Sequence, residues 1–471
     1  MSDQNANPRP PLSLQALREK VNEGEVDTVV MVFPDTHGRL VGKRLTAHYF
    51  LDHCTGEDGG AGTHGCNYLL TVNIEMDPLD GFDLASWDRG FGDFAMKPDL
   101  STLRLLPWQR SACGEGTRTA AMVICDVQFD DGKLVQEAPR SVLRKQLDRL
   151  ASQHLTCNIA SELEFFLFNQ TYHQAYEAGY ANLLPSSDYR IDYHTMQTTR
   201  DEPILHALRQ QMELAGVSIE STKGEWGKGQ HEVNFAYGPP LAMADGHMVF
   251  KQGAKEIAEQ HGKCLSFMPK ISANEAGNSC HIHVSIWRGS ENLFWDAKAN
   301  GPSKYFRQFL GGQMKYSREL CCCFAPTINA YKRFQPGSWA PTKMAWAMDN
   351  RTTGFRVVGH GNSFRIENRM PGGDANPYLA FAASIAAGLA GVEENLDCGE
   401  PYCGNAYADP KLPALPTSLK EAADLLERSE LARIMLGEEV LKFYVHTARQ
   451  EVKAFDAAVT DWERVRYFER I

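Results

Sequence analysis

The chain has 471 residues, 43% of them hydrophobic, and a formal net charge of −11. A single hydrophobic core stops growing at about 250–300 residues, so this length predicts at least two domains. The negative balance excludes a broad nucleic-acid-binding surface, which needs an excess of lysine and arginine, but it allows small anions to bind at a few local arginines.

The N-terminus and the cysteines indicate the cellular compartment. Residues 1 to about 12 are polar and rich in proline, which predicts disorder and provides no apolar segment of a signal peptide. The longest apolar run, residues 378–392, is short for a membrane span and favours a buried helix. The twelve cysteines are scattered, and the consecutive Cys321, Cys322 and Cys323 suit neither a disulfide framework nor a zinc site. We therefore expect a cytoplasmic protein with reduced thiols.

The N-terminal part shows strand patterns after one short helix. Residues 12–23 have the apolar spacing of a helix, and residues 28–33 form a strand that turns back at Asp35–Gly38 into a second strand, 39–45. Residues 54–117 are rich in glycine, aspartate and proline and predict long loops around short strands. After a strand over 120–129, the domain boundary is placed near residue 130. The predicted units are therefore a tail with a short helix (1–24), a first domain (25–130) and a second domain (131–471).

The second domain mixes strand and helix patterns. Several strands follow one another without an intervening helix, which favours an α+β fold with a largely antiparallel sheet over a doubly wound fold. A helix starts at the Glu137–Arg140 segment, where a proline precedes its first turn, and extends to about residue 154. The predicted strands cover residues 159–168, 217–223, 230–237, 278–287, 354–359 and 364–369. The predicted helices cover residues 200–215, 240–261, 302–324, 376–393, 417–427 and 435–457.

Three of these strands carry possible metal ligands. Glu162 and Glu164 share one strand face, and because two like charges in a half-buried strand repel, a divalent cation is their natural compensation. A solvated edge strand is the alternative. The segment 223–234 is a glycine-rich hairpin with Glu225 on one arm and Glu232 on the other, which alone is a common surface feature.

A histidine pair and a set of arginines complete the pattern. His281, His283 and Ser285 share a strand face; such a pair is often structural or zinc-binding, but carboxylates outnumber histidines here and favour magnesium or manganese. A zinc hydrolase built on this pair leaves the arginines unexplained. Surface salt bridges explain some of them, whereas a site for phosphate and carboxylate explains all, since guanidinium binds both anions bidentately. The arginines are Arg333, Arg351, Arg356, Arg365 and Arg369, around Glu367.

Six segments, taken in their order along the chain, resemble the glutamine synthetase superfamily. The resemblance covers nearly the whole chain from about residue 25. They are SELEFF, GEWGKGQHEVNF, NSCHIHVS, INAYKRFQPG, NRTTGFRVVGHGNSFRIENR and GGDANPYLAFAA. The resemblance implies an N-terminal β-grasp domain, a catalytic domain with a curved, largely antiparallel sheet flanked by helices, and active sites formed between subunits of stacked rings, with a dodecamer as the expected assembly.

The resemblance also implies a role for each matching residue. One metal is held by Glu164, Glu225 and Glu232, and a second by Glu162, His281 and Glu367, with two to three Mg²⁺ or Mn²⁺ ions per site. The catalytic residues are Asp35, Arg351 and Glu225, of which Asp35 reaches into the neighbouring subunit's site to bind and deprotonate the amine. Glutamate and amine are bound by Gly277, Arg333, Arg351, Arg369 and Trp339, and ATP by His283, Ser285, Arg356 and Arg365.

The implied reaction uses ATP to activate a poor electrophile. ATP phosphorylates the γ-carboxylate of L-glutamate, with cations and arginines neutralising the transferring phosphoryl group. A neutral amine then attacks the acyl phosphate, and since it arrives protonated, a carboxylate must remove its proton.

The chain departs from glutamine synthetases at two positions. Trp339 replaces a flap glutamate that closes over the ammonium site, which predicts a pocket for an amine that carries carbon; the alternative is that Trp339 only packs the flap. Ala276 replaces an asparagine that helps to hold glutamate. Both departures occur in relatives that attach glutamate to organic amines, and the chain looks most like γ-glutamyl ligases acting on ethanolamine, polyamines, or alkyl- and arylamines.

The choice of amine stays open at this stage. An aromatic or alkyl amine needs an apolar pocket, which Trp339 and Trp226 can supply; ethanolamine needs one polar partner, for which Tyr189 and Tyr193 are weak candidates. A polyamine needs a second anionic group, and we identify none, so a small primary monoamine is favoured. The alternatives are a polyamine ligase, an ammonia-using glutamine synthetase and, from another class, a non-catalytic structural relative. Nucleic acid and membranes are not expected partners.

Overall fold

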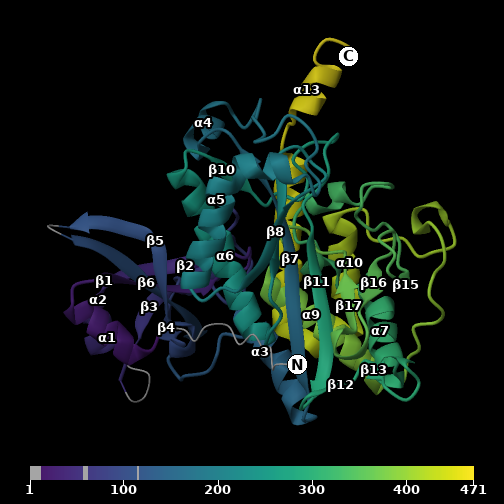
Figure 1. Ribbon diagram of the computed structural model, residues 1–471, viewed down its shortest axis with the longest axis horizontal. Helices are drawn as coiled ribbons and strands as arrows, with labels where there is room; N and C mark the ends of the chain where they lie inside the picture. The colour runs from purple at the N-terminus through teal and green to yellow at the C-terminus, as the bar shows by residue number, and fades with distance from the viewer. Residues whose placement is uncertain (1–11, 57–61, 114–115) are drawn as a thin grey trace.

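The computed structural model describes residues 12–56, 62–113 and 116–471, which fold into two main β-sheets covered by helices (Figure 1). The expected disorder of the first eleven residues lies outside the described part of the chain. The mixture of helices with sheets that are mostly antiparallel confirms the predicted α+β class.

The first sheet has six strands in the order β2-β1-β6-β4-β3, with β5 also paired to β6. β1 and β2 form the predicted hairpin, in which Gly42 faces Val32 so closely that a Cβ on it would lie 1.9 Å from the Met31 carbonyl oxygen. β5 is longer than the short strands expected between residues 54 and 117. The elements of this part are α1 (Leu14–Asn22), β1 (Val26–Pro34), β2 (Leu40–Thr46), α2 (Ala47–His53), β3 (Thr63–Cys66), β4 (Asp93–Pro98), β5 (Arg104–Cys113) and β6 (Gly116–Gln128), with short 3-10 turns at Asn67–Leu70, Trp87–Arg89 and Leu100–Thr102.

The second sheet has nine strands in the order β15-β16-β17-β11-β7-β9-β8, with β10 paired to β7 and β12 to β11. All its pairs are antiparallel except β15 with β16. Its strands are β7 (Thr156–Phe168), β8 (Ile219–Gly224), β9 (Gln230–Phe235), β10 (Cys264–Ser266), β11 (Cys280–Arg288), β12 (Glu291–Asn292), β15 (Trp346–Met348), β16 (Phe355–Val358) and β17 (Arg365–Asn368). A separate two-stranded ribbon joins β13 (Trp295–Asp296) to β14 (Gly301–Pro302).

Helices cover one face of this second sheet. Leu163 and Phe165 of β7 are fully buried and belong to one hydrophobic core with residues of the helices. Because side chains alternate along a strand, Glu162 and Glu164 must point to the opposite face. The helices are α3 (Pro139–Ser152), α4 (Tyr172–Glu177), α5 (Thr195–Leu214), α6 (Pro240–Gln260), α7 (Lys304–Tyr316), α8 (Cys321–Phe324), α9 (Pro377–Glu393), α10 (Leu419–Arg428), α11 (Glu430–Leu436), α12 (Glu438–Ala457) and α13 (Asp461–Tyr467), with 3-10 turns at Ala330–Arg333, Gly361–Ser363 and Ala406–Ala408.

The long apolar run forms α9, which is buried from residue 377 to residue 391 and confirms the prediction of a buried helix. Within the described ranges, no helix is long and apolar enough to cross a membrane. The cysteines with described side chains are all free. Two predicted helices are interrupted: the one over 302–324 ends at Tyr316 and restarts at Cys321, and the one over 435–457 is broken at Gly437, which has φ +90°.

A buried ion network joins the first sheet to the helices. Arg140 of α3 is 2% exposed and donates both to Asp245 of α6 (3.1 and 2.9 Å) and to Asp126 of β6 and Asp99, which follows β4. Removing one partner from such a buried network typically costs about 3–5 kcal/mol. The network therefore fixes the position of the first sheet against the second part of the chain.

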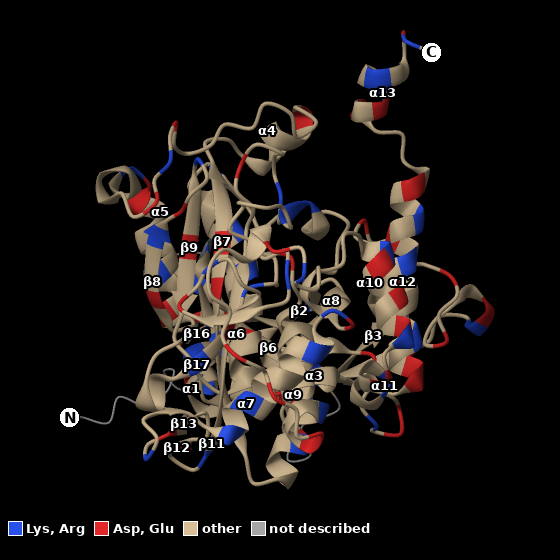
Figure 2. Ribbon diagram, turned by 90° about the vertical axis from the view of Figure 1, so that its right-hand side faces the viewer, with Lys and Arg blue, Asp and Glu red and all other residues tan. Residues whose placement is uncertain are grey.

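Near the C-terminus, α12 and α13 carry interleaved acidic and basic residues, and α13 extends beyond the body of the molecule (Figures 1 and 2).

Candidate active site

Strand register brings the acidic residues and histidines together on the uncovered face of the second sheet. His281 of β11 pairs directly with Glu162 of β7, and His283 pairs with Glu367 of β17. On the other side of β7, Glu164 pairs with Glu232 of β9. Directly opposite side chains on paired strands lie about 5 Å apart. The pairing therefore brings together side chains of β7, β9, β11 and β17, which are far apart in sequence. Figure 2 shows the acidic positions on β7 and β9.

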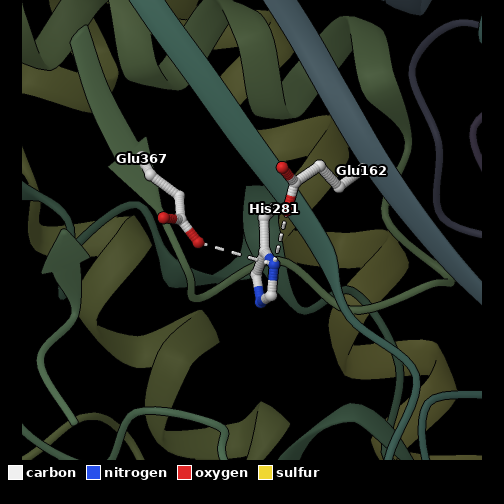
Figure 3. A group of neighbouring side chains, drawn as sticks. All are labelled: Glu162, His281 and Glu367. Atoms are coloured by element: carbon white, nitrogen blue, oxygen red, sulfur yellow. Dashed lines mark hydrogen bonds and ion pairs between the residues drawn. The ribbon is translucent and has the colours of Figure 1, made fainter. Parts of the chain in front are cut away.

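The first cluster contains Glu162, His281 and Glu367 (Figure 3). Nδ1 of His281 lies 3.3 Å from Glu162 Oε2 and 3.6 Å from Glu367 Oε1. Nε2 of His283 lies 3.0 Å from the other oxygen of Glu162. Burial acts to raise the pKa of Glu162, but hydrogen bonds with His281 and His283 hold it well below its usual range. Each of the three residues offers one atom within the spacing of a single cation.

The second cluster contains Glu164, Glu232 and again His281. Glu164 accepts hydrogen bonds from the Ser279 backbone N–H (2.7 Å) and from Gln230 (3.2 Å). Burial and the nearby charge of Glu225 raise the pKa of both Glu164 and Glu232 above the ordinary value of a glutamate. The positive charge near these two carboxylates is therefore too small to offset the cost of burying their ionised forms.

The donor set fits a divalent cation. Burial, followed by the charge of Arg369, lowers the pKa of His281 to about 4, so its ring is neutral at neutral pH, as a metal ligand must be. Its Nε2 is buried and has no hydrogen-bond partner among the described residues. Carboxylates dominate both clusters, and oxygen-rich sites suit magnesium or manganese. An unpartnered imidazole nitrogen beside carboxylates with raised pKa values is the arrangement that a bound cation would complete.

Adding Mg²⁺ or Mn²⁺ is expected to raise the Tm, and to raise it more at about pH 8.5 than at about pH 6.5. Raised pKa values of Glu164 and Glu232 mean that the cation-free folded protein binds more protons than the unfolded chain above about pH 4.3, so its stability falls as pH rises. A cation displaces these protons, and its effect grows with pH. Thermal unfolding with and without EDTA measures this; in Glu232→Gln the pH dependence should weaken. An increase that does not depend on pH would contradict the assignment.

Glu225 lies one residue beyond β8, in the turn of the predicted hairpin, and is not part of either cluster. Its carboxylate forms an ion pair with Lys223 and accepts a hydrogen bond from the Trp226 backbone N–H (3.1 Å). Lys223 Nζ also lies 4.4 Å from the ring centroid of Tyr193, a contact that no sequence pattern predicts. The ammonium group of Lys223 is therefore the cation that pairs with Glu225 in this structure.

Two of the predicted arginines neutralise Glu367. Arg356 donates to Glu367 (2.7 Å) and to Asp349, while Arg369 pairs with the other oxygen of Glu367 and donates to the Trp339 carbonyl oxygen (3.3 Å). Burial acts to raise the pKa of Glu367, but Arg369 holds it at about 2. Glu367 is fully buried and stays ionised for this reason.

Arg333 is buried behind the site, with 1% of its surface exposed. It donates to the carbonyl oxygens of Met370 and Arg369 (2.8 Å each) and to Ser279 Oγ (3.2 Å). Gly277 is required beside it, since a Cβ there would lie 2.7 Å from Arg333 Cγ. Arg333 thus links the end of β17 to the start of β11, and direct contact of Arg333 and Gly277 with glutamate stays a prediction.

The remaining predicted residues lie on or next to the strands of the second sheet. Arg351 is exposed and makes no side-chain hydrogen bond or ion pair with a described residue, so its guanidinium is open to an anion. Arg365 donates to Nδ1 of His283 (3.1 Å). Ser285 is buried and accepts a hydrogen bond from the Trp287 indole (2.8 Å). Ala276 is half-buried.

Trp339 forms an aromatic wall beside these groups. Its ring packs against Trp226 at 5.5 Å between centroids and an interplanar angle of 67°. It has φ +66°, a left-handed conformation that is unfavourable for a bulky residue and that usually persists where the surroundings fix it. The side chain is 45% exposed, so the ring packs on one side and is open on the other.

Asp35 has a different environment from the one expected. It is fully buried within its own chain, where it accepts hydrogen bonds from the backbone N–H groups of His37 (3.0 Å) and Arg39 (2.8 Å) and pairs with the Arg39 side chain (2.7 Å). Its carbonyl oxygen accepts a hydrogen bond from Asn376 at the start of α9. Asp35 thus stabilises its turn, and its role in a neighbouring subunit stays a prediction.

Comparison with known proteins gives consistent matches. The sequence profile described as "Glutamine synthetase, catalytic domain" matches residues 136–467. The chain is 50% identical over 467 residues to a γ-glutamylethanolamide synthetase of Streptomyces coelicolor, covering 99% of this chain and 98% of that protein. It is 34% identical over 460 residues to a glutamate–isopropylamine ligase of Pseudomonas sp., covering 97% and 98%. A solved complex of GmaS with ADP superimposes with a TM-score of 0.81 at 27% identity, over 96% of this chain and 99% of that one.

Proposed function

The chain belongs to the glutamine synthetase family, and from this premise we propose that it joins the γ-carboxylate of L-glutamate to a small primary organic amine. ATP drives the reaction through a γ-glutamyl phosphate. The favoured amines are ethanolamine, alkylamines and arylamines. Two of the similar proteins are described as acting on ethanolamine and isopropylamine, which supports this class of substrate.

The observation that carries the proposal is the aromatic wall next to a carboxylate. Trp226 follows Glu225 directly in the chain, its backbone N–H donates to that carboxylate, and its ring contacts Trp339. Each of the four N–H groups of a buried ammonium ion needs an acceptor, whereas an organic ammonium group needs acceptors at its nitrogen and apolar surface for its carbon atoms. This pair of indoles beside Glu225 suits the second kind of molecule.

The anionic substrates require the arginines and the two clusters. We assign Arg351, with its open guanidinium, to the glutamate carboxylates and the transferring phosphoryl group, and Arg356, Arg365, His283 and Ser285 to the phosphates of ATP. Glu162, His281 and Glu367 would hold one Mg²⁺ or Mn²⁺ ion, and Glu164, Glu232 and Glu225 would hold a second. When bound, these cations neutralise charge on the phosphoryl group. Glu225 would join the second ligand set only after its ion pair with Lys223 is broken.

The amine must lose a proton before it attacks. Glu225, the carboxylate beside the aromatic wall, is placed to hold the ammonium form of the amine. Asp35 of a neighbouring subunit is the proposed acceptor of the proton; the buried turn of Asp35 would have to rearrange for this. We propose rings of subunits, with a dodecamer as the assembly.

An amine panel tests the proposed function. Phosphate release is followed with ATP, Mg²⁺, L-glutamate and, in turn, ammonium, methylamine, isopropylamine, ethanolamine, putrescine, spermine and aniline. We expect kcat/KM to be at least about tenfold higher for one of the monoamines than for ammonium, because burying a few methylene groups contributes about 1–3 kcal/mol. A preference for ammonium would identify an ordinary glutamine synthetase. No response to any amine would identify a non-catalytic relative.

A further inference from the structure

The loop 187–193 packs directly on the hairpin that carries Glu225 and Trp226. Ser187 accepts a hydrogen bond from the Gly229 backbone N–H (2.6 Å), and the Tyr193 N–H donates to the Gly224 carbonyl oxygen (3.3 Å). Ile191 is fully buried, and a Cβ on Gly224 would lie 2.4 Å from its carbonyl oxygen. The loop is thus anchored at both ends and in the middle.

Arg190 is the exposed residue of this loop that faces the aromatic wall. Its guanidinium carbon lies 4.2 Å from the centroid of the Trp226 ring, and its backbone forms an isolated β-bridge with Lys228 of the hairpin. Its side chain forms no ion pair or hydrogen bond with any residue in the described ranges. A stacked guanidinium keeps its full charge and directs its N–H groups outward. The wall formed by Trp226 and Trp339 therefore ends in a stacked guanidinium that has no ion-pair partner among the described residues.

We propose that Arg190 is a specificity-determining residue that excludes amines with a second positive charge. This inference rests on the proposed function. The reacting nitrogen of such an amine lies at Glu225, and its carbon chain lies along the two indoles. The far end of the amine then lies next to Arg190. The guanidinium repels a second ammonium group at this position. A hydroxyl group accepts a hydrogen bond from the guanidinium, and an uncharged alkyl group is not repelled by it. The preferred class is a primary monoamine with a short neutral or hydroxylated tail.

The magnitude follows from Coulomb's law. Two like charges several ångströms apart at a half-exposed surface repel enough to change binding by about tenfold, and salt weakens the repulsion. Reversing the charge at position 190 replaces repulsion with attraction. The diamine should gain mainly through a lower KM, because the far end of the substrate does not take part in the chemistry.

The test compares kcat/KM for putrescine, ethanolamine and n-propylamine, with products identified by mass spectrometry. In Arg190→Glu, the putrescine-to-ethanolamine ratio should rise by about tenfold or more over the wild type, through the KM for putrescine. Arg190→Gln should give a smaller rise, and Arg190→Lys should keep the wild-type ratio. Ratios within one preparation do not depend on the active fraction, so partial misfolding of a variant does not affect them.

Arg200→Glu is the matched control, since Arg200 is an exposed arginine on α5 without a contact to either tryptophan. It should leave the ratio unchanged. A ratio in Arg190→Glu within about twofold of the wild type, or an equal shift in Arg200→Glu, would overturn the inference while monoamine ligation by the wild type still stood. If the wild-type protein ligates no organic amine, the proposed function itself fails.

Discussion

Replacing Glu162 by glutamine is expected to lower kcat/KM for ATP-dependent γ-glutamyl amide formation by about 100- to 1,000-fold. Glu162 contacts both His281 and His283 and belongs to the first cluster, so one neutralised carboxylate removes a cation ligand and the partner of two imidazoles. Glutamine has nearly the same shape, and the Glu162 side chain is 27% exposed, so the fold should tolerate the change. Phosphate release with product analysis measures the loss, and thermal unfolding checks the fold.

Glu220→Gln provides the control for this variant. Glu220 lies on β8 of the same sheet, is exposed and belongs to neither cluster. It should keep wild-type activity. Activity of Glu162→Gln within about threefold of the wild type, with normal dependence on Mg²⁺, would show that the first cluster does not bind a catalytic cation.

Replacing Trp339 by glutamate is expected to reverse the amine preference. The new carboxylate lies where the aromatic wall borders the site, so it favours a small cation and removes apolar surface from the wall. We expect kcat/KM for ethanolamine or isopropylamine to fall by about 10- to 100-fold. The ratio of glutamine to the γ-glutamyl amide of the organic amine should rise by a similar factor. Competition between ammonium and the amine, read by mass spectrometry, measures this ratio.

Two variants control for the loss of an indole. Trp339→Phe keeps an aromatic ring and should retain the preference for an organic amine. Trp87→Glu makes the same charge change at an exposed tryptophan of the N-terminal part and should leave selectivity unchanged. If Trp339→Glu kept the wild-type preference, Trp339 would serve only to pack the flap.

The face of each functional strand was predictable because strand alternation depends on local sequence alone. Leu163 and Phe165 entered the core and Glu162 and Glu164 faced away, as their spacing required. The six ordered motifs also led to the correct family. The apolar run at residues 378–392 was long enough to be recognised as a buried helix, and the structure confirmed it.

The pairing of residues across strands was not predictable from one strand at a time. Register places His281 opposite Glu162 and His283 opposite Glu367, so His283 contacts a carboxylate of the first cluster as well as Arg365. Register involves backbone contacts between distant segments, such as Trp287 with Thr156, 131 residues earlier, and no local pattern encodes it. The resemblance to a family supplied what local patterns could not.

Long side chains were the least predictable part of the site. Lys223 pairs with Glu225, and Arg333 donates to backbone carbonyls instead of facing an open cleft. Arg190 lay in a loop where no pattern marked it. Such flexible side chains follow the charges and carbonyl groups that the assembled fold places near them, and these neighbours are known only once the chain has folded.

The central claim is that this chain ligates glutamate to an organic amine through an acyl phosphate. One measurement tests both parts: L-glutamate carrying ¹⁸O in its γ-carboxylate is incubated with ATP, Mg²⁺ and equal concentrations of ethanolamine and ammonium, and the amides and phosphate are analysed by mass spectrometry. We predict that γ-glutamylethanolamide is the main amide and that ¹⁸O appears in the released phosphate. Glutamine as the main product, or phosphate free of ¹⁸O, would contradict this account.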